Sequence, residues 1–139
     1  MGFDVETQNI HGRVTALGSA GGHTLVVDRP SSVGGGGLGF NGGELLHLAV
    51  AGCISNDLFR EAAAAGIRLV AVRVVVRGDF AGEPPTSTGI DYDVEVSGEA
   101  DEERLRALVA HVDQIAEIPS SLRRGTKVRL VATAVKGAR

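Results

Sequence analysis

Two stretches in the middle of the chain alternate between apolar and polar residues and predict a pair of strands. Residues 70–79 are rich in valine, with Arg73 and Arg77 on one face and Val72, Val74 and Val76 on the other. Residues 90–96 place Asp91, Asp93 and Glu95 between apolar positions. A period of two is typical of half-exposed strands, and the Gly-Glu-Pro-Pro-Thr connection has turn chemistry. We therefore expect an antiparallel hairpin whose basic and acidic faces meet in solvent, where cross-strand charge pairs stabilise it modestly.

Two segments have the longer period of helices. The first begins at Glu44 and runs for about 22 residues, ending where Gly66 is suited to a C-cap. Its first half is apolar nearly all round, which is typical of a helix buried on most sides, and its second half is amphipathic. The second helix is predicted at residues 101–118, with one apolar face and Pro119 after its end.

Three further strands complete the expected domain. Residues 13–17 and 23–28 flank a Gly-Gly turn, and residues 128–134 contain alternating apolar positions. The glycine-rich break at residues 30–43 has too little chain before it to link two domains, so we expect a packed or functional loop. The order ββ–loop–α–ββ–α–β predicts one α+β domain over residues 1–139, with mainly antiparallel sheets, a long buried central helix and a second amphipathic helix.

Composition narrows the function classes. The chain has 139 residues with a net charge of −3 and no cluster of Lys and Arg, so a nucleic-acid partner is not expected. No apolar run is long enough for a membrane span and the first residues do not resemble a signal peptide, so a soluble, cytoplasmic protein is expected. One cysteine and four histidines without ligand spacing predict neither a disulfide framework nor a metal site, and no cofactor motif stands out.

Cys53 is the only soft nucleophile of the chain. It lies deep in the predicted helix, where neither the positive end of the helix dipole nor free N–H groups stabilise a thiolate. Its neighbours at i+3 and i+4 are Asn56, which can hydrogen-bond a thiolate, and Asp57, which disfavours one. From composition alone, a buried small hydrophobe is the more common role for such a residue. Likewise, Glu44 at a helix start and His23 in a turn have ordinary structural explanations.

The stretch Glu44-Leu-Leu-His-Leu-Ala-Val-Ala-Gly-Cys53, preceded by glycines and followed by Ala116-Glu-Ile-Pro-Ser-Ser, resembles the OsmC-like family of osmotically inducible and organic hydroperoxide resistance proteins. The resemblance covers roughly residues 20 to 135. It implies an α+β domain that forms an intertwined homodimer, with the cysteine-bearing helix at the subunit interface. A second chain would then cover the apolar first half of that helix.

The resemblance also implies roles for single residues. In the family's peroxidases a thiolate attacks the O–O bond and becomes a sulfenic acid, a second cysteine closes a disulfide, and an arginine and a glutamate keep the first thiol ionised. Cys53 matches the attacking cysteine, whereas Ile118 stands where the second cysteine would be. Glu44 matches the acidic residue of the family's Pro-x-Glu-Leu-Leu pattern. In the family the arginine follows a Gly-Gly pair, and in this chain His23 stands at that position, after Gly21-Gly22. The chain is therefore identified as a divergent one-cysteine member.

Two functions follow from this resemblance. The first is a thiol peroxidase that reduces organic hydroperoxides at Cys53, with Glu44 and His23 as candidate catalytic residues and an external thiol as reductant. The second is a non-catalytic module that binds a small apolar or thiol-containing ligand at the dimer interface. In either case we expect Leu38, Phe40, Asn56 and Ile118 to line the pocket. The expected partners are a second copy, the small molecule and, for the peroxidase, an external thiol, whereas nucleic acid and membranes are not expected.

Overall fold

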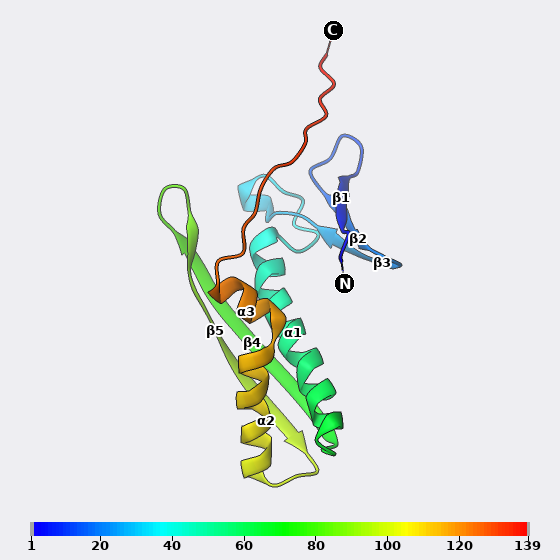
Figure 1. Cartoon of the computed structure of the whole chain (residues 1–139). Coiled ribbons are helices and arrows are strands. Elements are labelled where there is room, and N and C mark those ends of the chain that lie inside the picture. The colour runs from blue at the N-terminus through cyan, green and yellow to red at the C-terminus, as the bar shows by residue number, and fades with distance from the viewer. Residues whose placement is uncertain (1, 139) are drawn as a thin grey trace. The chain divides into compact units, whose positions relative to one another are not determined.

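The computed structural model describes residues 2–138 (Figure 1). These residues fall into two compact units. One unit contains the chain up to Gly52 together with Arg73–Glu95. The other contains Cys53–Val72 and the chain from Val96 onward. Because the long helix and the long hairpin each run through both units, the chain connects the units several times, and the prediction of one domain over residues 1–139 stays a prediction.

The first unit begins with an antiparallel three-stranded sheet in the order β1 (Glu6–Asn9), β2 (Ala16–Ala20), β3 (His23–Val27). The register of β2 with β3 runs from Ala16 opposite Val27 to Ala20 opposite His23, so Gly21 and Gly22 form the expected two-residue turn. Gly21 has φ +58°, a conformation that favours glycine. The sequence pattern did not predict β1, whose four residues are all exposed and polar.

The glycine loop (residues 30–41) contains a short 3₁₀ turn, η1 (Ser31–Val33), and is hydrogen-bonded to Asp28 at the end of β3, although most of its residues are exposed. Phe40 rejoins the sheet as a parallel bridge to Val27, with Asp28 N–H donating to Phe40 O at 2.9 Å. A Cβ on Gly39 would collide with the backbone carbonyl of Val26. The glycine at this position therefore lets the loop lie directly on β3.

Helix α1 (Gly42–Ala64) confirms the predicted main helix, and it ends at Gly66 with φ +71°. Ile67 N–H donates to Ala62 O at 2.8 Å, which closes the helix in the manner of a glycine C-cap. The first half of α1 is less buried than predicted. Leu48 is 48% exposed within the single chain, because no described element of the chain covers that side.

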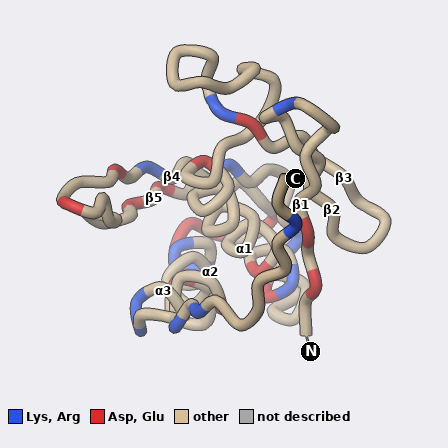
Figure 2. Tube along the Cα trace, turned by 90° about the horizontal axis from the view of Figure 1, so that it is seen from above, with Lys and Arg blue, Asp and Glu red and all other residues tan. Residues whose placement is uncertain are grey.

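The hairpin of β4 (Leu69–Ala81) and β5 (Thr86–Gly98) matches the predicted pair and extends it at both ends. Its charged face carries Arg77–Asp93 at 2.7 Å and Arg73–Glu95 at 3.4 Å, as the alternation predicted. Figure 2 shows residues of both charges along β4 and β5. The Arg77 guanidinium, by hydrogen bond and by charge, lowers the pKa of Asp93.

The second amphipathic helix is shorter than predicted. Helix α2 (Glu102–Ile115) is capped by the Asp101 side chain, which accepts from Arg104 N–H at 2.8 Å, and the chain turns extended at Ala116. A separate helix α3 (Glu117–Arg123) follows, and Pro119 lies in its first turn rather than after a helix end. Proline is tolerated there because the first-turn N–H groups have no partner within a helix.

The core of the second unit comes from apolar residues four apart on two helices: Ile54, Leu58 and Ala62 of α1, and Leu108, Val112 and Ala116 in and after α2. Two polar links join these helices. Arg104 donates to the carbonyl of Ala65 at 2.9 Å, and His111 Nε2 lies 2.8 Å from Glu61 Oε1.

The predicted strand at residues 128–134 is not formed. The C-terminal segment (residues 126–138) has no regular secondary structure, and its apolar side chains are nearly fully exposed, with Val128 at 93% and Leu130 at 85%. Figure 1 draws it as an orange-to-red coil. A strand needs a neighbouring strand for its hydrogen bonds, and the described part of the chain offers this segment none.

Candidate functional site

Cys53 lies in the middle of α1 and is half-buried. Its Sγ donates a long hydrogen bond to Asp57 Oδ2, at 3.9 Å. Asp57 is itself buried, and its other carboxylate oxygen pairs with Arg60 Nη1 at 3.2 Å. Of the two neighbours that the helical spacing predicted, the thiol is therefore bound to the carboxylate of Asp57, while Asn56 is exposed.

Glu44 occupies the first turn of α1 and makes a reciprocal cap with Asn41. Asn41 N–H donates to Glu44 Oε1 at 3.0 Å, and Glu44 N–H donates to Asn41 Oδ1 at 2.8 Å. This capping box satisfies two backbone donors at the helix start. Nine residues separate Glu44 from Cys53, about two and a half turns, so the two side chains do not meet within one helix. A catalytic role for Glu44 remains a prediction.

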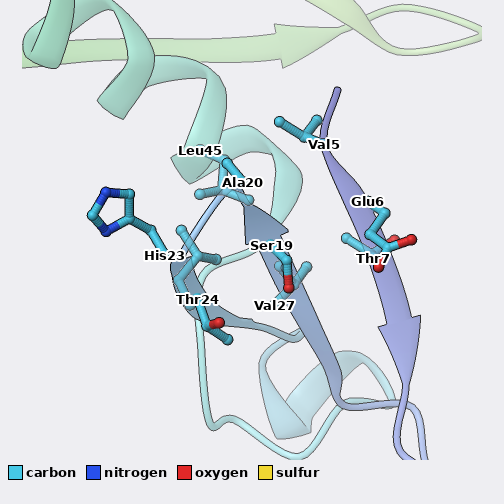
Figure 3. Close-up of a pocket in the computed structure, with 11 residues that line it drawn as sticks. Val5, Glu6, Thr7, Ser19, Ala20, His23, Thr24, Val27 and Leu45 are labelled. Carbon is cyan, nitrogen blue, oxygen red and sulfur yellow. The ribbon is translucent and has the colours of Figure 1, made fainter. Parts of the chain in front are cut away.

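His23 lies at the beginning of β3, on the rim of a pocket of about 440 Å³ formed by the three strands and Leu45 of α1 (Figure 3). Its imidazole projects away from the other labelled side chains. The pocket is lined mainly by apolar and small side chains: Val5, Glu6, Thr7, Gly18, Ser19, Ala20, Thr24, Leu25 and Val27 complete it. Such a pocket suits an apolar group, and it was not predicted because β1, which forms one wall, was not predicted.

The four residues expected to line a substrate pocket are spread over three elements. Leu38 and Phe40 belong to the glycine loop and are 70% and 43% exposed. Asn56 is exposed on α1, and Ile118 lies in α3 with 37% of its surface exposed. None of the four is among the residues lining the pocket at the three-stranded sheet. Their part in binding stays a prediction.

Asp28 is a buried acid that the sequence pattern did not single out. Its two carboxylate oxygens accept from the N–H groups of Arg29, Gly36 and Leu38 at 2.7, 3.0 and 3.2 Å and from Thr15 Oγ1 at 2.8 Å. The hydrogen bond from Gly36, followed by that from Arg29, holds the pKa of Asp28 at about 2. The carboxylate thus fastens the glycine loop to the end of β3. An aspartate two residues before Pro30 and the glycine-rich stretch was the available signal, because aspartate side chains often bond nearby backbone N–H groups.

His47 is a further polar residue of the first unit whose side chain is partly enclosed. Its Nδ1 donates to Gly43 O at 2.6 Å, its ring meets Phe80 edge-on at a centroid distance of 6.1 Å, and Nε2 is buried without a partner among the described residues. Gly78 of β4 lies so close to this nitrogen that an added Cβ would collide with it. These contacts give His47 a structural role between α1 and β4.

The described residues hold no cluster of His, Cys, Asp and Glu that could bind a metal ion. Within the same part of the chain, no helix has both the length and the apolar character to cross a membrane.

The comparisons with known proteins agree on one family. The family model for OsmC-like protein matches residues 34–131. The OsmC-like protein of Mycoplasma pneumoniae has a similar structure, with TM-score 0.76, 16% identity, and coverage of 91% of this chain and 89% of that one.

Two further similar structures have names that refer to hydroperoxides. The organic hydroperoxide resistance protein OsmC of Legionella pneumophila gives TM-score 0.68 and 18% identity over 88% of this chain and 90% of that one. A putative organic hydroperoxide resistance protein of Vibrio cholerae, with captopril bound in one of its active sites, gives 0.56 and 23% over 88% and 85%. No curated protein matches the chain. The structural likenesses at this identity establish the fold.

Proposed function

The chain belongs to the OsmC-like family, and we propose from this premise that it acts in oxidative stress as a one-cysteine thiol peroxidase for organic hydroperoxides. The observation that carries the proposal is the position of Cys53, the chain's single cysteine, in the central helix of an OsmC-like domain. The proposed site is cytoplasmic and lies in a homodimer.

The proposed cycle needs one cysteine and an external thiol. The thiolate of Cys53 attacks one oxygen of the hydroperoxide, the O–O bond breaks, and the other oxygen takes a proton and leaves as an alcohol. Sγ is thereby oxidised to a sulfenic acid. One external thiol then condenses with the sulfenic acid, releasing water and forming a mixed disulfide. A second external thiol reduces that disulfide and restores Cys53 as the thiol, leaving the external thiols joined by a disulfide.

Exposed apolar surface supports the homodimer. Leu48 and Phe59 of α1 are each 48% exposed, and Val128, Leu130, Val131 and Val135 of the C-terminal segment are between 84% and 93% exposed. A lone chain leaves this surface in water, whereas a second copy would bury it. In the proposed dimer, Leu38, Phe40, Asn56 and Ile118 line the substrate pocket, and Glu44 and His23 remain the candidate groups that act with Cys53.

The test is the reaction of reduced protein with cumene hydroperoxide, followed by intact mass, against the matched variant Cys53→Ser. We expect a gain of one oxygen on the native protein, reversed by added thiol, and no gain on the variant. A rate equal to that of a free alkyl thiol would contradict the peroxidase.

A second function is favoured by two observations: the apolar pocket of about 440 Å³ and the hydrogen bond that binds the Cys53 thiol to a carboxylate. The alternative is a non-catalytic module for a small apolar or thiol-containing ligand, and the relative from Vibrio cholerae holds captopril in an active site. Native mass spectrometry distinguishes the two. A retained small molecule together with a slowly reacting Cys53 favours the binding module, and an empty dimer counts against it.

A further inference from the structure

Asn41 and Gly42 form an Asn-Gly pair at the point where the glycine loop meets α1. The backbone N–H of Leu45 donates to Asn41 O at 3.0 Å, so Asn41 caps the helix and Gly42 is its first residue. Neither residue belongs to the pocket at the three-stranded sheet or takes part in the proposed peroxide chemistry. An asparagine followed by glycine has a chemistry of its own, because the backbone nitrogen of the glycine can attack the side-chain carbon of the asparagine.

Gly42 offers an accessible nitrogen for this attack. The first N–H groups of a helix have no partner within the helix, so the Gly42 nitrogen is not bound to a helical carbonyl. Gly42 is exposed, and a Cβ built on it would meet nothing within 4 Å. In the Pro-x-Glu-Leu-Leu pattern that Glu44 matches, Gly42 stands in the place of the proline. A proline nitrogen in a chain carries no hydrogen and does not react in this way, so the glycine introduces the reactive N–H.

The side chain of Asn41 is prepared as the group that is attacked. It belongs to a half-buried residue, and its Oδ1 accepts from Glu44 N–H at 2.8 Å. When a nitrogen attacks Cγ, negative charge develops on Oδ1. A backbone donor already aimed at this oxygen, at the positive end of the helix dipole, stabilises that charge in the manner of an oxyanion hole. The capping hydrogen bond therefore favours the attack as well as the helix.

We infer that Asn41 is a site of spontaneous deamidation in the folded protein. The Gly42 nitrogen forms a bond to Asn41 Cγ and gives its proton to water. The bond from Cγ to Nδ2 breaks, and ammonia leaves with a proton taken back from water, so that a cyclic succinimide remains. Water then opens the ring at one of its two carbonyl carbons, which gives either aspartate or isoaspartate. No oxidant or reductant takes part, and the inference does not depend on the proposed function.

Both products place a negative charge at the start of α1, but they differ in their effect on the helix. Aspartate caps a helix as well as asparagine does, and its charge suits the positive end of the dipole. Isoaspartate carries the main chain through the side-chain carbon, so its free carboxyl group no longer lies where Asn41 Oδ1 accepts from Glu44 N–H. The reciprocal capping box is then lost, which loosens the beginning of the helix that carries Cys53.

The test is incubation of the purified full-length protein in warm, mildly alkaline phosphate buffer, followed by ion-exchange chromatography, intact mass and peptide mapping. We expect a more acidic form to accumulate, with the mass change of an amide converted to a carboxyl group, and this change to map to Asn41. The other two asparagines are internal controls. Asn9 is followed by the β-branched Ile10, and the N–H after Asn56 lies inside α1, so neither should change.

Gly42→Pro is the decisive variant. It removes the reactive N–H, proline is suited to the first position of a helix, and an added Cβ has open space at this position. We expect G42P to lose the acidic form. Gly42→Ala keeps the N–H but adds a methyl group beside it, so it should form the acidic species several-fold more slowly. Circular dichroism and a thermal melt show whether both variants are folded. If G42P does not fold, Gly42→Ala carries the test, and a native rate in that variant overturns the inference.

The remaining outcomes are equally decisive. An acidic form that maps to Asn41 in the native protein and is lost in G42P supports the inference. If the acidic form appears only in a sample unfolded in urea, the capping box protects Asn41 and the inference is overturned. A folded G42P that becomes acidic at the native rate also overturns it. Cys53→Ser should deamidate at the native rate, so the result is independent of the outcome for the peroxidase.

Discussion

The glycine loop lacks the sequence pattern of a regular element but is held in place by contacts within the chain, whereas the C-terminal segment has the sequence pattern of a strand but forms no strand. The glycine loop has no apolar period, yet it is held by hydrogen bonds to Asp28 and by Phe40 on β3. The C-terminal segment has the alternation of a strand, yet no described part of the chain pairs with it and its valines are exposed. The backbone groups of the glycine loop find their hydrogen-bond partners within the chain. The strand pattern of the C-terminal segment predicts that its pairing strand belongs to another chain.

The largest predicted effect is a loss of affinity in the proposed homodimer when a charge is placed in the C-terminal segment. Leu130→Asp places a charge at a position that the alternation assigns to the buried face, and we expect the proposed homodimer to weaken by at least about 100-fold, as for a central apolar interface residue. Sedimentation velocity over a range of concentrations measures this. The matched control is Thr133→Asp, which adds the same charge on the opposite face and should weaken the dimer far less. A native protein that is monomeric at micromolar concentration would contradict both the prediction and the role of the segment.

The second-largest predicted effect is a loss of folding stability when the contact between the glycine loop and β3 is disturbed. Gly39→Ala adds a methyl group against the Val26 carbonyl, which belongs to the backbone and cannot move aside alone. We expect the free energy of unfolding to fall by about 1–3 kcal/mol, as for overpacking at a tight site. Urea denaturation gives the value. Gly22→Ala is the control, since an added Cβ there meets nothing within 4 Å. Equal stabilities of the two variants would show that the loop does not need its close approach.

The Asp28 contact should appear as a dependence of stability on pH. The pKa of Asp28 is about 2 in the folded chain, below its ordinary value of 3.8. A lowered pKa stabilises the fold fully above the unfolded value, and this contribution is lost as the pH falls from 3.8 toward 2. Denaturation at stepped pH should therefore show a loss of stability in this window that Asp28→Asn lacks. Parallel curves for the two proteins would mean that the carboxylate does not fasten the loop.

The contrast between the glycine loop and the C-terminal segment explains which parts of the structure could be predicted from the sequence. Apolar period and turn residues predicted α1 and the β4–β5 hairpin with its charge pairs, because those elements are determined by local pattern. They did not predict β1, which is polar throughout, or the break at Ala116, because neither has a periodic signal. Of the candidate site, the helical spacing predicted the approach of Asp57 to Cys53. The binding of Asp28 by the backbone depends on the path of a loop, which no spacing rule gives.

The smallest effect on stability should come from an exposed side chain of the same loop. Leu38 is 70% exposed, so Leu38→Ala should change the free energy of unfolding by less than about 0.5 kcal/mol. If Leu38 lines the proposed substrate pocket, the same change removes an apolar contact with the hydroperoxide and should raise KM by about tenfold while kcat stays near native. Val33→Ala, at 53% exposure in the same loop, is the matched control and should alter neither value. An unchanged KM in L38A would remove Leu38 from the pocket. A large loss of stability would instead place it with Asp28 and Gly39 among the residues that hold the loop.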